Sequence, residues 1–109
     1  MAKKVTNAEF NDWVDHLRAT APPPPKTKVI VRRVDPELLK GNTGDTLKRR
    51  AVFEIRIDKT LSRMETEWTL IHEWAHVLDW RPYRPMYSDH GPTWGVHYSE
   101  VYQAFYHTR

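Results

Sequence analysis

Two histidines four residues apart, with a glutamate beside the first, form the most chemically informative pattern in this 109-residue chain. His72, Glu73 and His76 spell H-E-x-x-H within a stretch whose apolar residues recur at helical spacing. On a helix these two imidazoles point the same way, so both can reach one metal ion. Glu73 is turned by about 100° from His72 and can take a proton from a water on the metal without being a ligand. The pattern predicts a zinc-dependent hydrolase with Glu73 as general base.

A catalytic zinc needs a third protein ligand and one open position for water. A third histidine six residues beyond the second is excluded, because Pro82 stands there. His90 has the most suitable context: Gly91-Pro92 is a rigid helix start that can aim it, and Trp94 can anchor the turn behind it. The other candidates for this ligand are Asp79, Asp89, His97 and Glu100.

The alternative without a metal is that His72 and His76 are partly exposed helix residues and Glu73 is a solvated charge. The position of the motif favours the metal. It lies in the middle of an amphipathic segment from Ser62 to Trp80, which opens with the capping box of Ser62 and Glu65. One continuous core face is expected from Met64, Trp68, Ile71, Ala75 and Leu78, and a second apolar face from Leu70, Trp74 and Val77. The helix should therefore be sandwiched between a sheet and another helix.

The N-terminal part of the chain is expected to form a helix, a spacer and the first strand. A helix over about 6–19 starts with a T-x-x-E capping box and carries an apolar stripe. Four prolines, Pro22 to Pro25, then form a stiff extended connector. Lys28 to Val34 is rich in β-branched residues and predicts a strand.

Two further elements complete the expected domain. Residues 35–46 contain D-P-E and G-N-T-G and predict a loop, while 47–58 predict a half-buried strand, antiparallel to the first. Beyond the central helix, residues 92–106 predict a last helix with a buried stripe of Trp94, Tyr98, Val101 and Phe105. The fold class is α+β: one small domain over 1–109 with an N-terminal helix, a short antiparallel sheet over about 28–58 and zinc helices over about 62–106.

The bulk composition is that of an ordinary soluble globular chain, with 39% apolar and 28% charged residues. The net charge of +3 permits an anionic partner without requiring one. The absence of cysteine excludes disulfides and thiolate metal sites. No signal peptide and no apolar run near 18 residues is visible, so we expect an intracellular, cytoplasmic protein without membrane contact.

The paired motifs resemble those of a known family. A strand, then His72-Glu73-Trp74-Ala75-His76, a loop, and His90-Gly91-Pro92-Thr93-Trp94 resemble the SprT-like (Spartan-type) zinc metallopeptidases over roughly residues 50–106. The resemblance implies a zincin-like domain with zinc held by His72, His76 and His90 and with Glu73 as general base. It also implies that 53–57 form an edge strand to which a peptide substrate adds by β-pairing. Many members carry a zinc ribbon or DNA-binding segments; this cysteine-free chain does not share the ribbon, so the substrate does not carry over.

Several residues are assigned only candidate roles. The candidate substrate-binding residues are Phe53, Ile55, Tyr83 and Tyr87. A donor to the oxyanion is sought among Tyr83, Tyr87, His97 and Tyr98. The competing class is a non-catalytic zinc-stabilised module for nucleic acid or protein, with weak DNA association through Lys48, Arg49, Arg50, Arg81 and Arg84. A fourth protein ligand on zinc would favour that module, and a water in its place would favour the enzyme.

Overall fold

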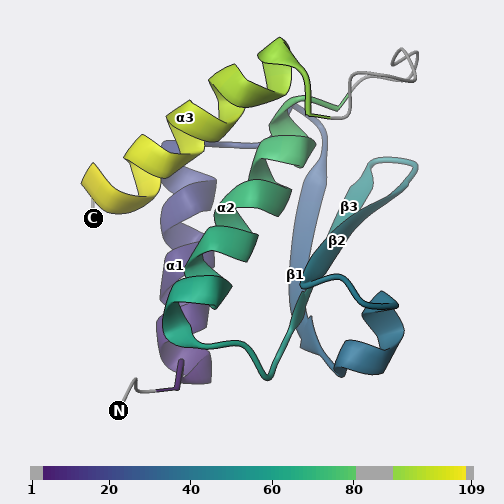
Figure 1. The fold of residues 1–109 in the computed structure, drawn as a ribbon. Coiled ribbons are helices and arrows are strands. Elements are labelled where there is room, and N and C mark those ends of the chain that lie inside the picture. The colour runs from purple at the N-terminus through teal and green to yellow at the C-terminus, as the bar shows by residue number, and fades with distance from the viewer. Residues whose placement is uncertain (1–3, 81–89, 108–109) are drawn as a thin grey trace.

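The structure is a computed structural model that describes residues 4–80 and 90–107. Its three α-helices lie on one side of a three-stranded sheet, and α2 lies between the sheet and α3 (Figure 1). The α+β class is thereby confirmed. The elements in chain order are α1 (Asn7–Thr20), β1 (Lys28–Val34), the 3-10 helix η1 (Pro36–Leu39), β2 (Gly44–Arg49), β3 (Val52–Asp58), α2 (Arg63–Leu78) and α3 (Pro92–His107).

Both predicted capping boxes are confirmed, and each fixes the first turn of its helix. Thr6 Oγ1 accepts the Glu9 backbone N–H at 3.1 Å, and Ser62 Oγ accepts that of Glu65 at 3.2 Å. In turn, the Glu65 carboxylate accepts a hydrogen bond from the Ser62 backbone N–H at 3.3 Å. A side-chain cap of this kind stabilises a helix by about 1 kcal/mol. The start of α2 is therefore set locally, and with it the position of the H-E-x-x-H turn.

The sheet is mixed, which corrects the expected antiparallel pairing of its first and last strands. The strand order is β1-β3-β2: β1 runs parallel to β3, and β2 runs antiparallel to it. Residues 47–58 are two strands rather than one, because the chain reverses at Arg50, whose φ is 56°. The prediction of a loop over 35–46 is wrong for its last three residues, because β2 begins at Gly44.

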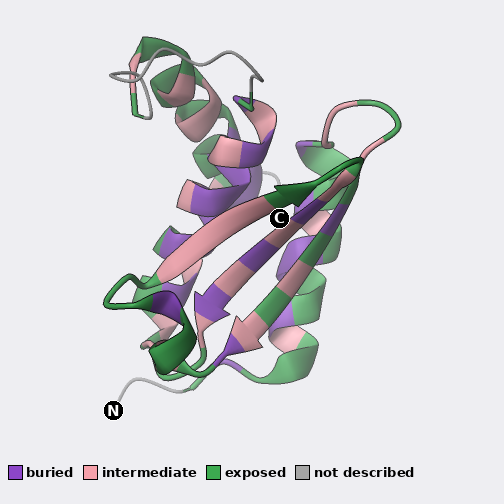
Figure 2. Cartoon of the chain, turned by 90° about the vertical axis from the view of Figure 1, so that its right-hand side faces the viewer, coloured by how far each residue is buried: buried purple, intermediate pink, exposed green. Residues whose placement is uncertain are grey.

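Strand β3 is the centre of the sheet, so the interpretation of 53–57 as an edge strand is wrong. The predicted alternation is confirmed: Phe53, Ile55 and Ile57 are 1%, 0% and 0% exposed, while the residues between them are half-buried (Figure 2). Backbone groups of β3 pair with a neighbour on each side. Phe53 and Ile55 therefore belong to the core and offer no free strand edge to a peptide.

Helix α2 is buried on the faces that meet the sheet and the other helices. Leu70, Ile71, Trp74, Ala75 and Val77 are all 0% exposed. The expected burial of the first two residues of the core stripe is wrong, since Met64 is 56% and Trp68 49% exposed. These two side chains instead line a groove against α3. The apolar pattern at the start of α2 thus marks an open surface.

Helix α3 confirms the predicted C-terminal stripe. Val101 and Phe105 are fully buried, and Trp94 and Tyr98 are partly buried against the same core. Within the described ranges, no helix has the length and hydropathy needed to cross a bilayer.

Candidate metal centre

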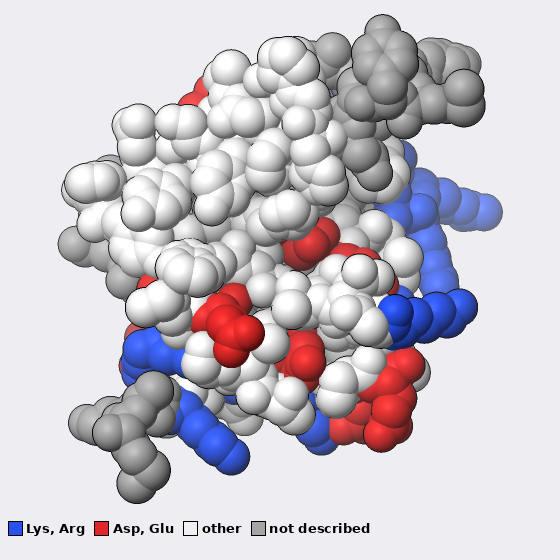
Figure 3. Space-filling view, viewed as in Figure 1, with Lys and Arg blue, Asp and Glu red and all other residues white. Residues whose placement is uncertain are grey.

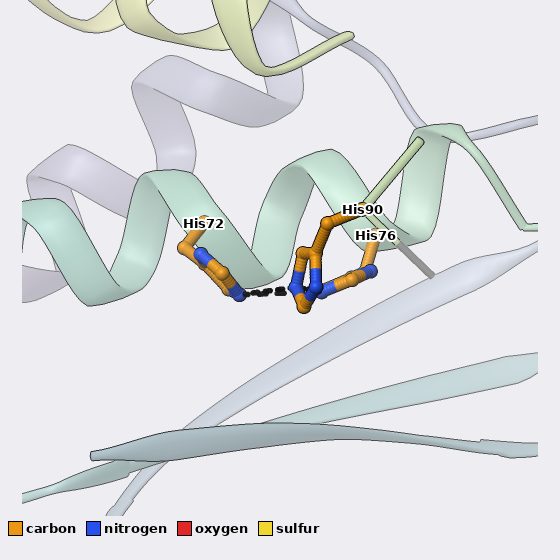
Figure 4. A group of neighbouring side chains, drawn as sticks. All are labelled: His72, His76 and His90. Atoms are coloured by element: carbon orange, nitrogen blue, oxygen red, sulfur yellow. Dashed lines mark hydrogen bonds between the residues drawn. The ribbon is translucent and has the colours of Figure 1, made fainter. Parts of the chain in front are cut away.

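Three imidazoles converge between α2 and the start of α3. His72 and His76 are one helical turn apart on α2, and His90 approaches them from the segment before α3 (Figure 4). The Nε2 atoms lie 3.3 Å apart for His72 and His76, 3.1 Å for His76 and His90, and 3.2 Å for His72 and His90. These three histidines form the single potential metal-binding group found among the described residues.

The triangle of nitrogens has the dimensions of a zinc site. Nitrogens that bind tetrahedral zinc at about 2.0–2.1 Å lie about 3.3 Å from one another. Hydrogen bonds cannot close such a triangle, because each Nε2 either carries a proton or offers a lone pair. Two lone pairs or two protons must therefore face each other at short range. A cation that receives three lone pairs removes this conflict, so the donor set fits a divalent metal.

The surroundings hold the imidazoles in place and keep one of them neutral. The Trp94 ring lies 5.0, 5.6 and 4.8 Å from the rings of His72, His76 and His90. It forms a wall behind the cluster, in line with the anchoring role expected from the sequence. Burial, and secondarily repulsion from His90, lower the pKa of His72 below its usual value. A neutral imidazole is the form that binds a metal.

Glu73 lies beside the cluster with its carboxylate largely removed from solvent. It is 7% exposed, its Oε1 accepts a hydrogen bond from Thr46 Oγ1 at 2.8 Å, and its Oε2 lies 3.9 Å from His72 Nε2. Burial raises the pKa of Glu73 to about 7; the Thr46 hydrogen bond opposes this shift, and the charge of Asp45 adds to it. A carboxylate with this pKa can both accept and return a proton near neutral pH.

The raised pKa predicts that Glu73→Gln stabilises the metal-free protein at alkaline pH. Folded Glu73 holds its proton between pH 4.5 and about 7, whereas the unfolded chain has lost it. The free energy of unfolding therefore falls as the pH rises through this window. Above pH 7 the total loss is about 3 kcal/mol. Glutamine keeps an oxygen for Thr46 and carries no charge. Urea unfolding in chelator should show the variant more stable at pH 8 and nearly equal to wild type at pH 4.5.

Strand β2 can approach α2 closely because Gly44 has no side chain. A Cβ added there would lie 2.6 Å from Thr69 Cγ2 and 2.9 Å from the Arg56 carbonyl oxygen. Thr46, two residues on, is thereby brought to Glu73. The absence of a side chain at residue 44 thus helps to close one wall of the site.

Gly44→Ala should destabilise the fold and loosen this wall. Overpacking of a tight contact costs about 1–3 kcal/mol, measured as a shift in the midpoint of chemical unfolding. Gly95→Ala is the matched control, because nothing lies within 4 Å of an added Cβ there. Alanine within α3 should be neutral or stabilising by up to about 1 kcal/mol. Equal stability of Gly44→Ala and wild type would contradict the close approach.

The other ligand candidates lie in a cluster of their own. His97 Nε2 is 4.0 Å from Asp79 Oδ1, and His97 Nδ1 is 3.6 Å from Glu100 Oε2. Asp79 is 2% exposed. The structure thus separates these three residues from the imidazole triangle. The remaining candidates lie outside the described residues: Asp89, Tyr83, Tyr87, Arg81 and Arg84.

Sequence reasoning missed the residues that β2 contributes to the site. Thr46 fixes the Glu73 carboxylate and Gly44 permits the approach, but both stand in a stretch interpreted as a loop. The alternation in 44–49 is weak, since none of its residues is buried. A glycine followed two residues later by threonine carries no motif that would have marked them.

Comparison of the chain with models of protein families, with curated proteins and with solved structures gives no match. The class that fold and site define is therefore an α+β domain with a three-histidine candidate metal centre and an adjacent buried glutamate.

Proposed function

We propose that the chain is a zinc-dependent peptidase of the SprT-like kind. The observation that carries the proposal is the triangle of His72, His76 and His90 Nε2 atoms next to the buried Glu73 carboxylate. Three histidines leave a tetrahedral zinc one open position, which is the arrangement of catalytic rather than structural sites. The likeness of the motifs to the SprT-like family supports the same assignment.

Zinc held by the three imidazoles would polarise a substrate carbonyl and lower the pKa of a coordinated water toward ~7. Glu73 takes the proton of the attacking water and returns it to the leaving amine. Thr46 holds Oε1 of that carboxylate at 2.8 Å and leaves Oε2 facing the imidazoles. Tyr98 lines the same cavity as Glu73, and we assign it as the donor to the oxyanion.

The substrate peptide is expected to add to β2, the outer strand on the α2 side. Strand β3 pairs with one edge of β2, and no other described strand pairs with the second edge of β2. Cavities of about 400 Å³ and 240 Å³ flank Glu73, the first on the His72 side and the second on the His76 side. An extended chain paired with β2 would run past Glu73 from one cavity to the other.

The proposal is tested by metal analysis of the purified protein together with an activity assay. About one zinc per chain and cleavage of an unfolded casein-like substrate are expected, and a chelator should abolish the cleavage. Adding zinc back should restore it. Zinc-loaded protein that leaves such substrates intact would contradict the peptidase.

A non-catalytic binding module is the second candidate, and one observation favours it. Lys48, Arg49 and Arg50 are exposed together at the turn between β2 and β3. Such a group can contact phosphate, with binding that weakens as salt is raised. Salt-sensitive DNA binding by a wild type that hydrolyses nothing would support the module over the enzyme.

A further inference from the structure

The cavity on the His72 side of the metal centre, called here the Trp68 cavity, has a volume of about 400 Å³. It is bounded by Glu65, Trp68 and Thr69 of α2, by Tyr98 of α3 and by Thr43 before β2. His72 and Glu73 form its inner end. The cavity therefore opens directly from the atoms that would carry out hydrolysis.

One wall of the Trp68 cavity is aromatic and open to solvent. Trp68 is 49% exposed, although it lies on the central helix of the domain. The Tyr98 ring opposite it is held by Trp94, at 5.0 Å between ring centroids. A large exposed aromatic beside a cavity marks a ligand-binding surface, and its face attracts cations as well as apolar groups.

The Trp68 cavity is acidic at the end away from the histidines, where Glu65 lies. No lysine or arginine is among the described residues that line the cavity. Arg63, two residues before Glu65 on α2, is paired with Glu9. On the face of the molecule shown in Figure 3, basic side chains lie at the margins, and acidic side chains lie both near the centre and at one margin.

The two carboxylates lie at different depths. Glu65 precedes His72 by seven residues, which corresponds to about 10.5 Å along the helix axis. Its Oε1 accepts the hydrogen bonds of the capping box, at 2.9 Å from Ser62 Oγ, so the other oxygen remains for a ligand. A group that reaches from the metal centre to Glu65 must be long, apolar along its stem and cationic at its end.

We infer that the Trp68 cavity receives a lysine or arginine side chain from a substrate residue that flanks the scissile bond. The inference rests on the proposed peptidase function. The aliphatic stem would lie on the Trp68 ring and the cation would reach Glu65, an arrangement that suits amphipathic cationic side chains.

The test is cleavage by the zinc-loaded full chain of peptides that differ at one residue on either side of the cleaved bond. Lysine, norleucine and glutamate are compared there, because norleucine keeps the stem and lacks the charge. For wild type we expect kcat/KM highest for lysine and lowest for glutamate. Glu65→Gln should reduce the lysine-to-norleucine ratio about threefold to fivefold, as expected for an exposed ion pair. Glutamine retains the capping box, so the helix start is preserved.

Two further variants separate the cavity from general effects. Trp68→Ala should lower kcat/KM about tenfold for lysine and norleucine alike, since both use the ring. Glu67→Gln is the matched control and should leave the ratio unchanged, because Glu67 bonds to Tyr106 at 2.7 Å and does not line the cavity. Equal rates for lysine and norleucine in wild type would overturn the inference and leave the peptidase standing. Failure to cleave any peptide would overturn both.

Discussion

Glu73→Gln is expected to retain zinc and to lower kcat for peptide hydrolysis about 10²–10⁴-fold, the range attributed to a general acid–base group. Glutamine can still accept the Thr46 hydrogen bond, so the geometry of the site is kept. It cannot take a proton from water. The loss should therefore appear in kcat, measured on zinc-loaded protein with an unfolded substrate, while zinc content stays near one per chain.

Glu67→Gln is the control for this experiment, because it removes a carboxylate from the same helix away from the histidines. Its Oε2 accepts a hydrogen bond from Tyr106, a role that glutamine can fill. It should cleave at nearly the wild-type rate. A Glu73→Gln variant that cleaves as fast as wild type would show that another group activates the water. A variant that loses zinc would instead place Glu73 among the ligands.

The opposite effects of this one substitution connect stability with function. The same variant is expected to gain about 3 kcal/mol in the metal-free protein at alkaline pH. Burial of Glu73 causes both results, because it raises the pKa toward neutrality and makes the ionised form costly. The ionised carboxylate lowers the stability of the fold despite its hydrogen bond from Thr46, so its presence beside three histidines points to a chemical use.

The helices of this protein could be predicted because their signals are local. A capping box within four residues and an apolar period of 3.6 give the start of α1 and α2, the buried stripe of α1 and the buried face of the second half of α2. The H-E-x-x-H spacing places His72 and His76 on one side for the same reason. His90 could be selected by its position before Gly91-Pro92, although only the fold brings it within 3.1 Å of His76.

The pairing of the strands could not be predicted in the same way. Parallel pairing of β1 with β3 depends on β2 lying on the far side of β3, which no pattern within 28–58 specifies. The turn between β2 and β3 uses Arg50 at φ 56° and has no glycine or asparagine to mark it. Without a marked turn, residues 47–58 have the pattern of one strand, and nothing in that pattern shows that β2 rather than 53–57 is the edge strand on the α2 side.

The exposure of Trp68 shows a further limit of sequence patterns. Trp68 lies three residues before Ile71 and seven before Ala75, which is the spacing of residues on one side of a helix. This spacing shows which side of the helix a residue occupies, but it does not show whether that side is covered. Burial also requires a partner element over that turn. Along the first half of α2 the partner leaves a groove instead, lined by Met64 and Trp68 with Tyr102 of α3. Apolar residues next to a metal motif can thus belong to a substrate surface.

His90→Ala is expected to weaken zinc binding by more than the 10–100-fold that loss of an outer-shell partner costs. The variant removes one of the three lone pairs and leaves two ligands from a single helix. His90 is exposed, so the metal-free fold should keep its stability. Competition with a chromogenic chelator measures the affinity, and the zinc-dependent rise in melting temperature should shrink accordingly.

His97→Ala is the matched control, since it removes a histidine of α3 that pairs with Asp79 and Glu100 and takes no part in the triangle. It should bind zinc as wild type does. The double comparison separates loss of a ligand from a general effect of removing an imidazole near α2. An unchanged zinc affinity in His90→Ala would show that another residue is the third ligand. Glu100 would be the next residue to test. Because His90 is the described residue that completes the triangle with the two histidines of α2, that outcome would also overturn the triangle as the metal site.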